Sequence, residues 1–385
     1  MRDLAPMARF GRLVASDLRD VTDDLAALDS SGFWAVAADF DGRTLCARFG
    51  DVRRTPRDTP GGTPRTGPAH APADASRWRG PDPGAWATSM DRAGYEEGVR
   101  TIRARIATGE VYQVNLCRVL TAPLPAGHGA VSSPDSDIDA LGAALAHGNP
   151  APYEGVIRLP AHGVEIATAS PELFLSRHGA VVESGPIKGT ARTAPELLPK
   201  DHAENVMIVD LVRNDLGRVC ATGSVTVPAL CAVEPHPGLV HLVSTVRGEL
   251  RPDAGWPELF AAAFPPGSVT GAPKSSALRI IGELETAPRG PYCGAVGWVD
   301  ADRRTARLAV GIRTFWIDRG GEGGPVLRFG AGAGITWGSD PYAEWAETEL
   351  KAARLLAVAS EGQAHAHAPA APGEGGPRTG GRTLR

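Results

Sequence analysis

What this 385-residue sequence lacks excludes several classes of function. It has no cluster of Lys and Arg, and its formal net charge of −4 argues against a nucleic-acid-binding surface. No apolar run approaches the ~20 residues that span a bilayer. The first residues lack the apolar stretch of a secretion signal. We therefore expect a soluble chain with neither nucleic acid nor membrane among its partners.

Cysteine is also scarce. The chain has five, an odd number with no CxxC pair: Cys46, Cys117, Cys220, Cys231 and Cys293. A chain of this length can bury a large core without disulfides, so reduced and mostly buried thiols are the simplest interpretation. Together with the missing signal, this predicts a cytoplasmic protein.

Composition divides the chain into four stretches. Two strand-like runs on either side of the Asp41-Gly42 turn predict a hairpin region over residues 1–50, attached to the main body. Residues 51–84 are rich in Pro, Gly, Arg and Thr and predict a flexible linker. Residues 85–358 form the main domain, and residues 359–385 predict a disordered tail. A shorter loop is expected over 128–139.

Periodicity within the main domain predicts a mixed fold. Asp91 begins a helix that Gly109 ends. Further helices are expected over 199–215, 255–264, 275–285 and 340–359. Strands are expected over 110–120, 153–159, 164–170, 223–230, 238–246, 294–301, 305–317 and 326–335. Because strands outnumber helices and several follow one another directly, the pattern is typical of an α/β (α+β) fold with much antiparallel pairing.

Two of the expected helices carry acidic residues spaced to share one face. Asp201 and Glu204 are three residues apart, and Glu344, Glu347 and Lys351 follow at spacings of three and four. Two solvated amphipathic helices explain this spacing. Apolar flanks show that both helices must pack, and if the acidic faces meet, a cation such as Mg²⁺ would relieve the repulsion. Spacing alone favours the solvated alternative.

One lysine lies on an unusually stiff segment, "SGPIKGTARTA". Pro186 fixes φ before Lys188, and Gly189 frees it afterwards. A tight turn that holds an amine predicts a role for that amine. The later stretch "FGAGAGI", with Gly332 and Gly334, favours close backbone approach to a small anion or a plain turn over a dinucleotide site.

Ten segments, in order from about residue 90 to 358, resemble the chorismate-utilising enzymes. They are "YQVNLCRVL", "SPELFL", "GPIKGTART", "KDHAENVMIVDLVRNDLGRVC", "VHLVSTVRGEL", "FPPGSVTGAPKSSALRIIGELE", "YCGAVGW", "GIRTFWI", "GAGAGI" and "DPYAEWAETELKA". The resemblance implies two large, mainly antiparallel sheets sandwiched by helices, with the active site between them.

The resemblance also implies roles for single residues. Glu204 and Glu347 would be the Mg²⁺ ligands, with Asp201 and Glu344 as acidic neighbours one turn earlier. Arg313 would clamp a substrate carboxylate, for which a bidentate fork is suited. The other implied substrate contacts are Tyr292, Thr270, Lys351, Gly332 and Gly334. His241 would protonate the departing C4 hydroxyl, although its sequence context equally fits a core histidine.

Three positions discriminate among the members. Water-adding relatives carry a lysine base where this chain has Gln113, and a glutamate acid where it has Gly185. Both departures point to ammonia as the nucleophile. Lys188 stands where anthranilate synthases have alanine, and a lysine there marks aminodeoxychorismate synthase component I. In that enzyme the lysine is thought to attack C2 of chorismate. Pairing with a substrate carboxylate is the alternative role.

Within the family, the ammonia comes from a glutaminase. Class I glutaminases place their cysteine in a Gly-x-Cys-x-Gly turn, and none of the five cysteines has that context. We therefore expect a separate glutaminase subunit as partner, and 4-amino-4-deoxychorismate, the precursor of 4-aminobenzoate, as product. Anthranilate synthase component I is the first rival, and isochorismate or salicylate synthase the second.

Overall fold

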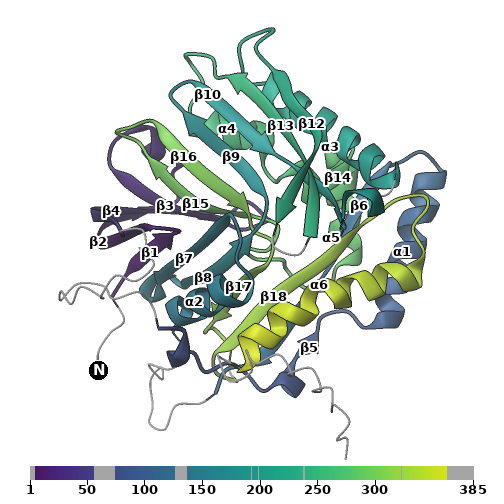
Figure 1. Cartoon of the computed structure of the whole chain (residues 1–385), viewed down its shortest axis with the longest axis horizontal. Helices are drawn as coiled ribbons and strands as arrows, with labels where there is room; N and C mark the ends of the chain where they lie inside the picture. Colours follow the sequence, from purple (N-terminus) through teal and green to yellow (C-terminus); the bar gives the residue numbers. More distant parts are fainter. Residues whose placement is uncertain are drawn as a thin grey trace, which may run out of the picture.

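A computed structural model describes residues 5–55, 74–125, 137–191, 193–197, 199–236, 239–321 and 323–361. Its helices are α1 (Arg92–Ala107), α2 (Ile138–Gly148), α3 (Pro199–Gly217), α4 (Trp256–Ala263), α5 (Lys274–Leu284) and α6 (Pro341–Glu361). Figure 1 shows them on the outside of the strands, with α6 running along β18 (Val326–Ile335).

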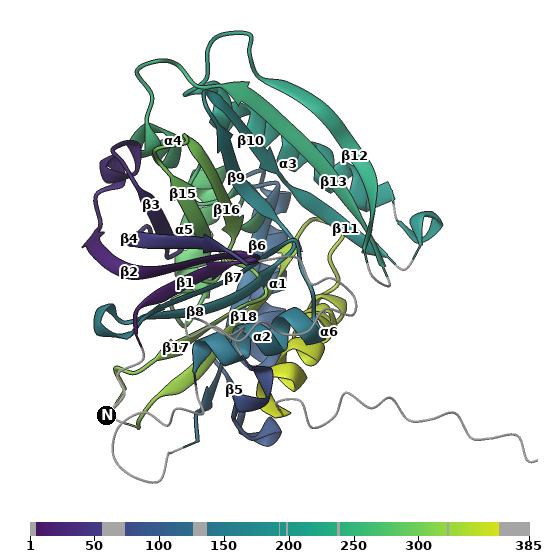
Figure 2. The ribbon, with the colours of Figure 1, turned by 60° about the vertical axis from the view of Figure 1, so that its left-hand side comes forward.

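The strands form one hydrogen-bonded network, and every pairing among the described residues is antiparallel. Besides β18 they are β1 (Met7–Phe10), β2 (Leu13–Thr22), β3 (Phe33–Ala38), β4 (Thr44–Arg54), β5 (Ala87–Thr88), β6 (Gln113–Pro123), β7 (Tyr153–Leu159), β8 (Val164–Ser170), β9 (Leu173–His178), β10 (Val181–Gly185), β11 (Ile187–Ala191), β12 (Thr226–His236), β13 (Leu239–Glu249), β14 (Gly271–Ala272), β15 (Ala295–Asp300), β16 (Thr305–Val310) and β17 (Thr314–Asp318). Figure 2 shows that β9, β10, β12 and β13 form a layer above β1, β7, β8 and β17. The mixed, mainly antiparallel fold is confirmed.

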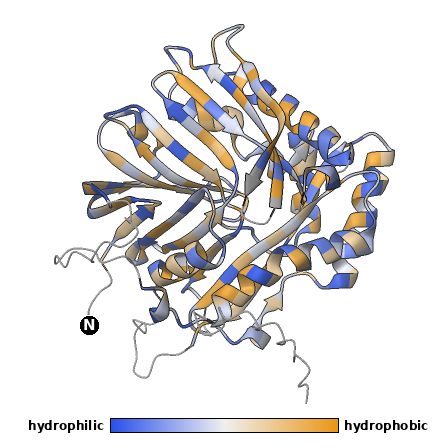
Figure 3. Ribbon diagram, viewed as in Figure 1, coloured by the Kyte–Doolittle hydropathy of each residue, from blue (hydrophilic) through white to orange (hydrophobic). Residues whose placement is uncertain are grey.

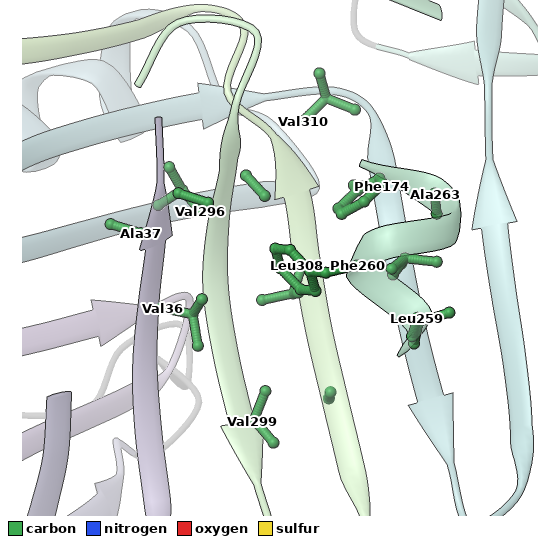
Figure 4. Packing of buried hydrophobic residues seen from close by; sticks show 14 of the residues in the cluster. Val36, Ala37, Phe174, Leu259, Phe260, Ala263, Val296, Val299, Leu308 and Val310 are labelled. Atoms are coloured by element: carbon green, nitrogen blue, oxygen red, sulfur yellow. The ribbon is translucent and has the colours of Figure 1, made fainter. Parts of the chain in front are cut away.

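Apolar residues on alternate positions build the core. Figure 3 shows polar and apolar segments alternating along several strands, as expected where one face of a sheet is buried. The largest cluster joins β3, β9, β15 and β16 to α3 and α4. Figure 4 shows Phe260 and Leu259 of α4 facing Leu308 of β16, with Phe174 of β9 beside them. This packing fixes α4 and the turn that follows it.

Helix boundaries follow the expected caps. The side chain of Asp91 accepts a hydrogen bond from Gly94 N at the start of α1, and Asp340 accepts one from Ala343 N at the start of α6. Such caps satisfy amides that have no partner inside the helix. Helix α6 begins at Pro341, directly after its cap Asp340. This starting point sets which residues lie on the acidic face of the helix.

The structure differs from the expected elements in several places; strands β1, β2, β9 and β10, for example, were not expected. The single strand expected over 305–317 is two strands, β16 and β17, because Arg313 between them has φ +50° and interrupts the extended backbone. Helix α2 was not expected; Asp137 caps it and it packs on β7 and β8.

The stretch expected to be a linker is structured at both ends. Strand β4 continues to Arg54, and Trp78 is fully buried and donates a 2.7 Å hydrogen bond from Nε1 to Ala359 O. The buried Trp78 thus holds in place a stretch whose overall composition is typical of a flexible linker. The rest of the expected linker, the core of the loop predicted over 128–139 and the tail after residue 361 lie outside the described residues.

Candidate active site

Lys188 lies on β11, which pairs with β13, and its amine points inward. Its Nζ donates a 2.9 Å hydrogen bond to the carbonyl of Ser268. The following residue, Gly189, has φ +76° at an irregularity in the β11–β13 register. A Cβ added there would come within 2.8 Å of Asp201 Cβ. Glycine is therefore required both for the turn and for the approach of α3.

Burial is the main reason why the pKa of Lys188 is lowered. Removing an ammonium from water disfavours its charged form. Glu172, Glu204 and Glu347 oppose the shift, and Lys351 adds to it. The direction suits a nucleophilic amine, which must be neutral to attack.

Glu172 is a site residue that sequence reasoning missed. It is 4% exposed, and burial raises its pKa to about 6, while Ser268, Lys188 and the amide of Ile187 act to lower it. Only its position in "SPELFL", an acidic residue between two apolar strands, could have indicated it. Lys188 and Glu172 thus share Ser268 as a neighbour.

Gln113 and Gly334 complete the wall beside Lys188. Gln113 begins β6 and is 1% exposed, and Gly334 lies on β18, which pairs with β6. A Cβ at Gly334 would stand 2.3 Å from Gln113 Nε2 and 3.9 Å from Lys188 Nζ. The Oε1 atom of Gln113 is buried and accepts no hydrogen bond from the described residues. Leaving a buried acceptor without a hydrogen bond costs free energy. The unpaired Oε1 atom of Gln113 therefore indicates that this side chain faces a ligand.

The same two strands also enclose Gly332. A Cβ at Gly332 would lie 2.5 Å from Cys117 Sγ, and the carbonyl of Gly332 accepts a 3.1 Å hydrogen bond from Lys351 Nζ. The two glycines therefore permit close packing of β18 on β6.

The acidic faces of α3 and α6 approach each other. Burial raises the pKa of Glu204, and Asp201 and Glu347 contribute to the rise. Burial also raises the pKa of Glu344. For Glu347 the effect of burial is outweighed by Lys351, whose Nζ lies 2.7 Å from Oε1, and the pKa is lowered.

The carboxylates of α3 and α6 are candidate ligands for Mg²⁺. Among the described residues no three His, Cys, Asp or Glu side chains form a metal-binding group. Mg²⁺ is commonly held by one or two carboxylates together with waters and substrate oxygens. The mutual influence of Glu204 and Glu347 fits that smaller ligand set.

Arg313 stands in the break between β16 and β17. Its left-handed backbone is costly for a residue with a Cβ, by ~1–2 kcal/mol. Burial lowers the pKa of its guanidinium, and no carboxylate in the described part of the chain forms an ion pair with it. A strained, partly buried and uncompensated cation is suited to an anionic ligand.

The remaining predicted residues, Tyr292, Thr270 and His241, are all buried. Tyr292 is 4% exposed, and Cys117 Sγ lies 3.8 Å from its hydroxyl oxygen. Thr270 Oγ1 donates to the carbonyls of Pro266 and Gly267 at 3.2 Å, in the turn that carries Ser268. His241 is also buried, and its β13 neighbour Leu242 pairs with Lys188.

A buried ion pair beneath the site was not foreseen. Arg289 pairs with Glu285 at 2.6 Å and donates to the carbonyls of Val269 and Asn115 at 2.9 and 2.7 Å. Glu285 also accepts from the amide of Cys117 at 2.8 Å. The pair therefore ties β6 to the turn that carries Ser268. In the sequence, only the opposite charges of Glu285 and Arg289, four residues apart, could have indicated this ion pair.

Residues 65–357 match the family described as chorismate binding enzyme. The chain belongs to this family. A curated relative, aminodeoxychorismate synthase component 1 of Salmonella typhimurium, is 38% identical over 284 residues, covering 71% of this chain and 59% of the relative. Aminodeoxychorismate synthase of Streptomyces pristinaespiralis is 41% identical over 292 residues, covering 72% of this chain and 37% of the relative.

Another chorismate-family relative carries a different name. Anthranilate synthase component 1 1 of Haloarcula marismortui is 37% identical over 292 residues, covering 73% of this chain and 56% of the relative. The chain thus spans between about a third and three fifths of the length of these curated relatives.

Solved structures confirm the fold. The menaquinone-specific isochorismate synthase of Escherichia coli has a TM-score of 0.70 at 18% identity, covering 92% of this chain and 88% of that chain. Anthranilate synthase component I of Streptococcus pneumoniae has a TM-score of 0.67 at 22% identity, covering 92% of this chain and 91% of that chain. Within the described residues, no helix is both long enough and apolar enough to cross a membrane.

Proposed function

We propose that this chain is an aminodeoxychorismate synthase component I, which converts chorismate and ammonia into 4-amino-4-deoxychorismate. The observation that carries the proposal is the inward-facing Lys188 amine, with Gln113 beside it in place of a base. Three of the curated relatives are named aminodeoxychorismate synthase component 1. Their names support the assignment but do not exclude the anthranilate synthases.

The first chemical step assigned to Lys188 is attack on the substrate ring. The neutral amine forms a bond to C2, the conjugated double bonds shift, and the C4–oxygen bond breaks. The departing hydroxyl leaves as water after it gains a proton, for which His241 is the proposed donor. Burial, which lowers the pKa of Lys188, increases the fraction of neutral amine.

The second step returns the lysine to its starting state. Ammonia forms a bond to C4, the double bonds shift back, and the bond between Lys188 and C2 breaks. The net change replaces the C4 hydroxyl with an amino group and involves no oxidation. Gln113 cannot act as a base toward water because an amide does not accept a proton at neutral pH.

The substrate carboxylates need fixed positive charge. Arg313 is assigned to one of them because its guanidinium has no partner among the described carboxylates. Glu204 and Glu347, with Asp201 and Glu344 nearby, would hold Mg²⁺, which when bound supplies positive charge for the other carboxylate. Tyr292, Thr270, Lys351 and the amides of Gly332 and Gly334 are assigned to substrate contacts.

A separate glutaminase is proposed as the ammonia source, and ammonium salts would replace it in vitro. The test is incubation with chorismate, Mg²⁺ and ¹⁵N-ammonium, followed by NMR of the product. The expected result is ¹⁵N bonded to C4, and 4-aminobenzoate once a lyase is added. Anthranilate with release of pyruvate would favour the rival anthranilate synthase. Isochorismate formed without nitrogen would favour the water-adding enzymes.

A further inference from the structure

A small cavity lies behind the layer formed by Glu172 and Ser268. It has a volume of ≈ 20 Å³ and is lined by Glu172, Ser184, Asp215 and Ser268 among apolar side chains. About 10–15 Å³ suffices for one water-sized molecule. Figure 4 shows Phe174, Ala263 and Val310, three members of the apolar lining, on β9, α4 and the end of β16. The cavity therefore has room for one small polar species.

The hydroxyl of Ser184 is an independent sign of a ligand. Ser184 is 7% exposed, lies on the same face of β10 as buried Val182, and lines the cavity. Its hydroxyl has no hydrogen-bond partner among the described residues, whereas its neighbour Glu183 faces outward and pairs with Arg247. A small polar ligand in the cavity would give this hydroxyl a hydrogen-bond partner.

The charges around the cavity favour a cation. Asp215 is 4% exposed and pairs with Lys274 at 2.7 Å, and Glu172 faces Lys188. Each carboxylate therefore has one lysine. The proposed reaction needs Lys188 neutral, and Glu172 then loses its positive partner. A monovalent cation in the cavity would replace that charge.

Ammonium fits both the size and the chemistry. It is about as large as water, it donates hydrogen bonds on all sides, and the carboxylates and serine oxygens of the lining accept them. The charge-matched alternative of similar size is potassium, which requires several oxygen ligands but has no part in the reaction.

We propose that this cavity is the binding site for the ammonium ion that supplies the nitrogen of the product, an inference that rests on the proposed function. Glu172 takes one proton from the bound ion: an N–H bond breaks, an O–H bond forms, and neutral ammonia is left with its electron pair free. Ser268 separates the cavity from Lys188, so ammonia reaches the ring past that residue.

Two substitutions at Ser184 test the site by kinetics. Ser184→Val fills the cavity with about one methyl group, and we expect the KM for ammonium to rise at least tenfold. Ser184→Ala removes the hydroxyl but keeps the space, and the expected rise is two- to fivefold. Chorismate affinity, measured by calorimetry, should stay within twofold in both. An unchanged ammonium KM in Ser184→Val overturns the inference, and so does an equal loss of chorismate affinity.

Crystals of the wild-type protein soaked in thallium(I) give a readout that does not depend on activity or on a variant's folding. An anomalous peak in the cavity, displaced by ammonium chloride, is the expected result. No peak, or displacement by potassium but not by ammonium, overturns it. Failure of the wild-type protein to aminate chorismate would instead refute the proposed function, whatever the crystals show.

Discussion

The Nζ atom of Lys188 donates a 2.9 Å hydrogen bond to the carbonyl of Ser268, 80 residues further along the chain. This bond joins β11 to the turn that follows α4, and the same turn carries Thr270. The amine is thus held by backbone, which cannot rotate away as a side-chain partner could. Fixed placement of a reacting group lowers the entropic cost of attack.

Replacing Lys188 with Met keeps the apolar stem and removes the amine. We expect formation of 4-amino-4-deoxychorismate to fall about a hundredfold or more, because positioned nucleophiles contribute at least that much. Chorismate affinity should change far less. Product analysis by mass spectrometry and calorimetry of chorismate binding check both statements. Retained amination at C4 in this variant would remove the nucleophile from the mechanism.

Gly334→Ala should displace Gln113, because the new methyl would stand 2.3 Å from Nε2. We expect kcat/KM for chorismate to fall at least tenfold, a loss of about 1.4 kcal/mol. Gly338→Ala is the matched control on the same segment, since a Cβ there meets nothing within 4 Å. Steady-state kinetics of the two variants should differ; equal values would place Gly334 outside the site.

Glu172 should make stability depend on pH. Its pKa is raised from 4.5 to about 6, so the folded state binds the proton more tightly than the unfolded state. The stabilisation is present below about pH 4.5 and is lost as pH rises through about 6. Relative to Glu172→Gln, the free energy of unfolding of the wild type should fall by ~2 kcal/mol over that range.

Urea denaturation of both proteins at several pH values measures this difference. Because each pH compares wild type with variant, titration of the other carboxyl groups largely cancels. A difference that does not change with pH would show that Glu172 titrates at its ordinary pKa.

Arg313→Gly should weaken chorismate binding while leaving the thermal stability of the fold nearly unchanged. Relief of the left-handed backbone, ~1–2 kcal/mol, is offset by the ~1 kcal/mol entropic cost of glycine, so Tm should change little. Loss of the guanidinium should raise the KM for chorismate by about 10–100-fold. Arg304→Gly is the control, since exposed Arg304 has φ +48°. An unaltered KM in Arg313→Gly would rule out the carboxylate contact.

Arg289→Met should destabilise the fold strongly. It leaves buried Glu285 without its cation and two carbonyls without a donor, a loss of ~3–5 kcal/mol. Arg279→Met is the matched control because the half-exposed Arg279 pairs with Glu283 and Glu110, and exposed pairs contribute ~0–1 kcal/mol. Thermal unfolding compares them; similar losses would contradict the role assigned to the buried pair.

Sequence reasoning predicted the elements that carry their own signals. Helices α1 and α6 begin at Asp91 and Asp340, whose side chains cap them, and the Asp41-Gly42 turn joins β3 and β4. Local chemistry decides such features. The acidic faces that hold Glu204 and Glu347 were likewise visible as spacing.

What sequence reasoning missed depends on contacts made after folding. The break at Arg313 requires a backbone conformation that nothing local demands, and the site role of Glu172 arises from burial by distant strands. The ion pair of Arg289 with Glu285 acquires its role because Asn115 lies above it. Non-local packing cannot be deduced from the spacing of residues in one chain.

The five cysteines, all within the described residues, form no disulfide, and Cys231 alone is not buried. Its sulfur lies 3.5 Å from the side chain of Asn205, the residue after Glu204 on α3. A thiol-reactive fluorophore or nitroxide should therefore attach at one place in the unaltered protein. The label would report on the helix that bears Glu204 as chorismate and divalent ions are added.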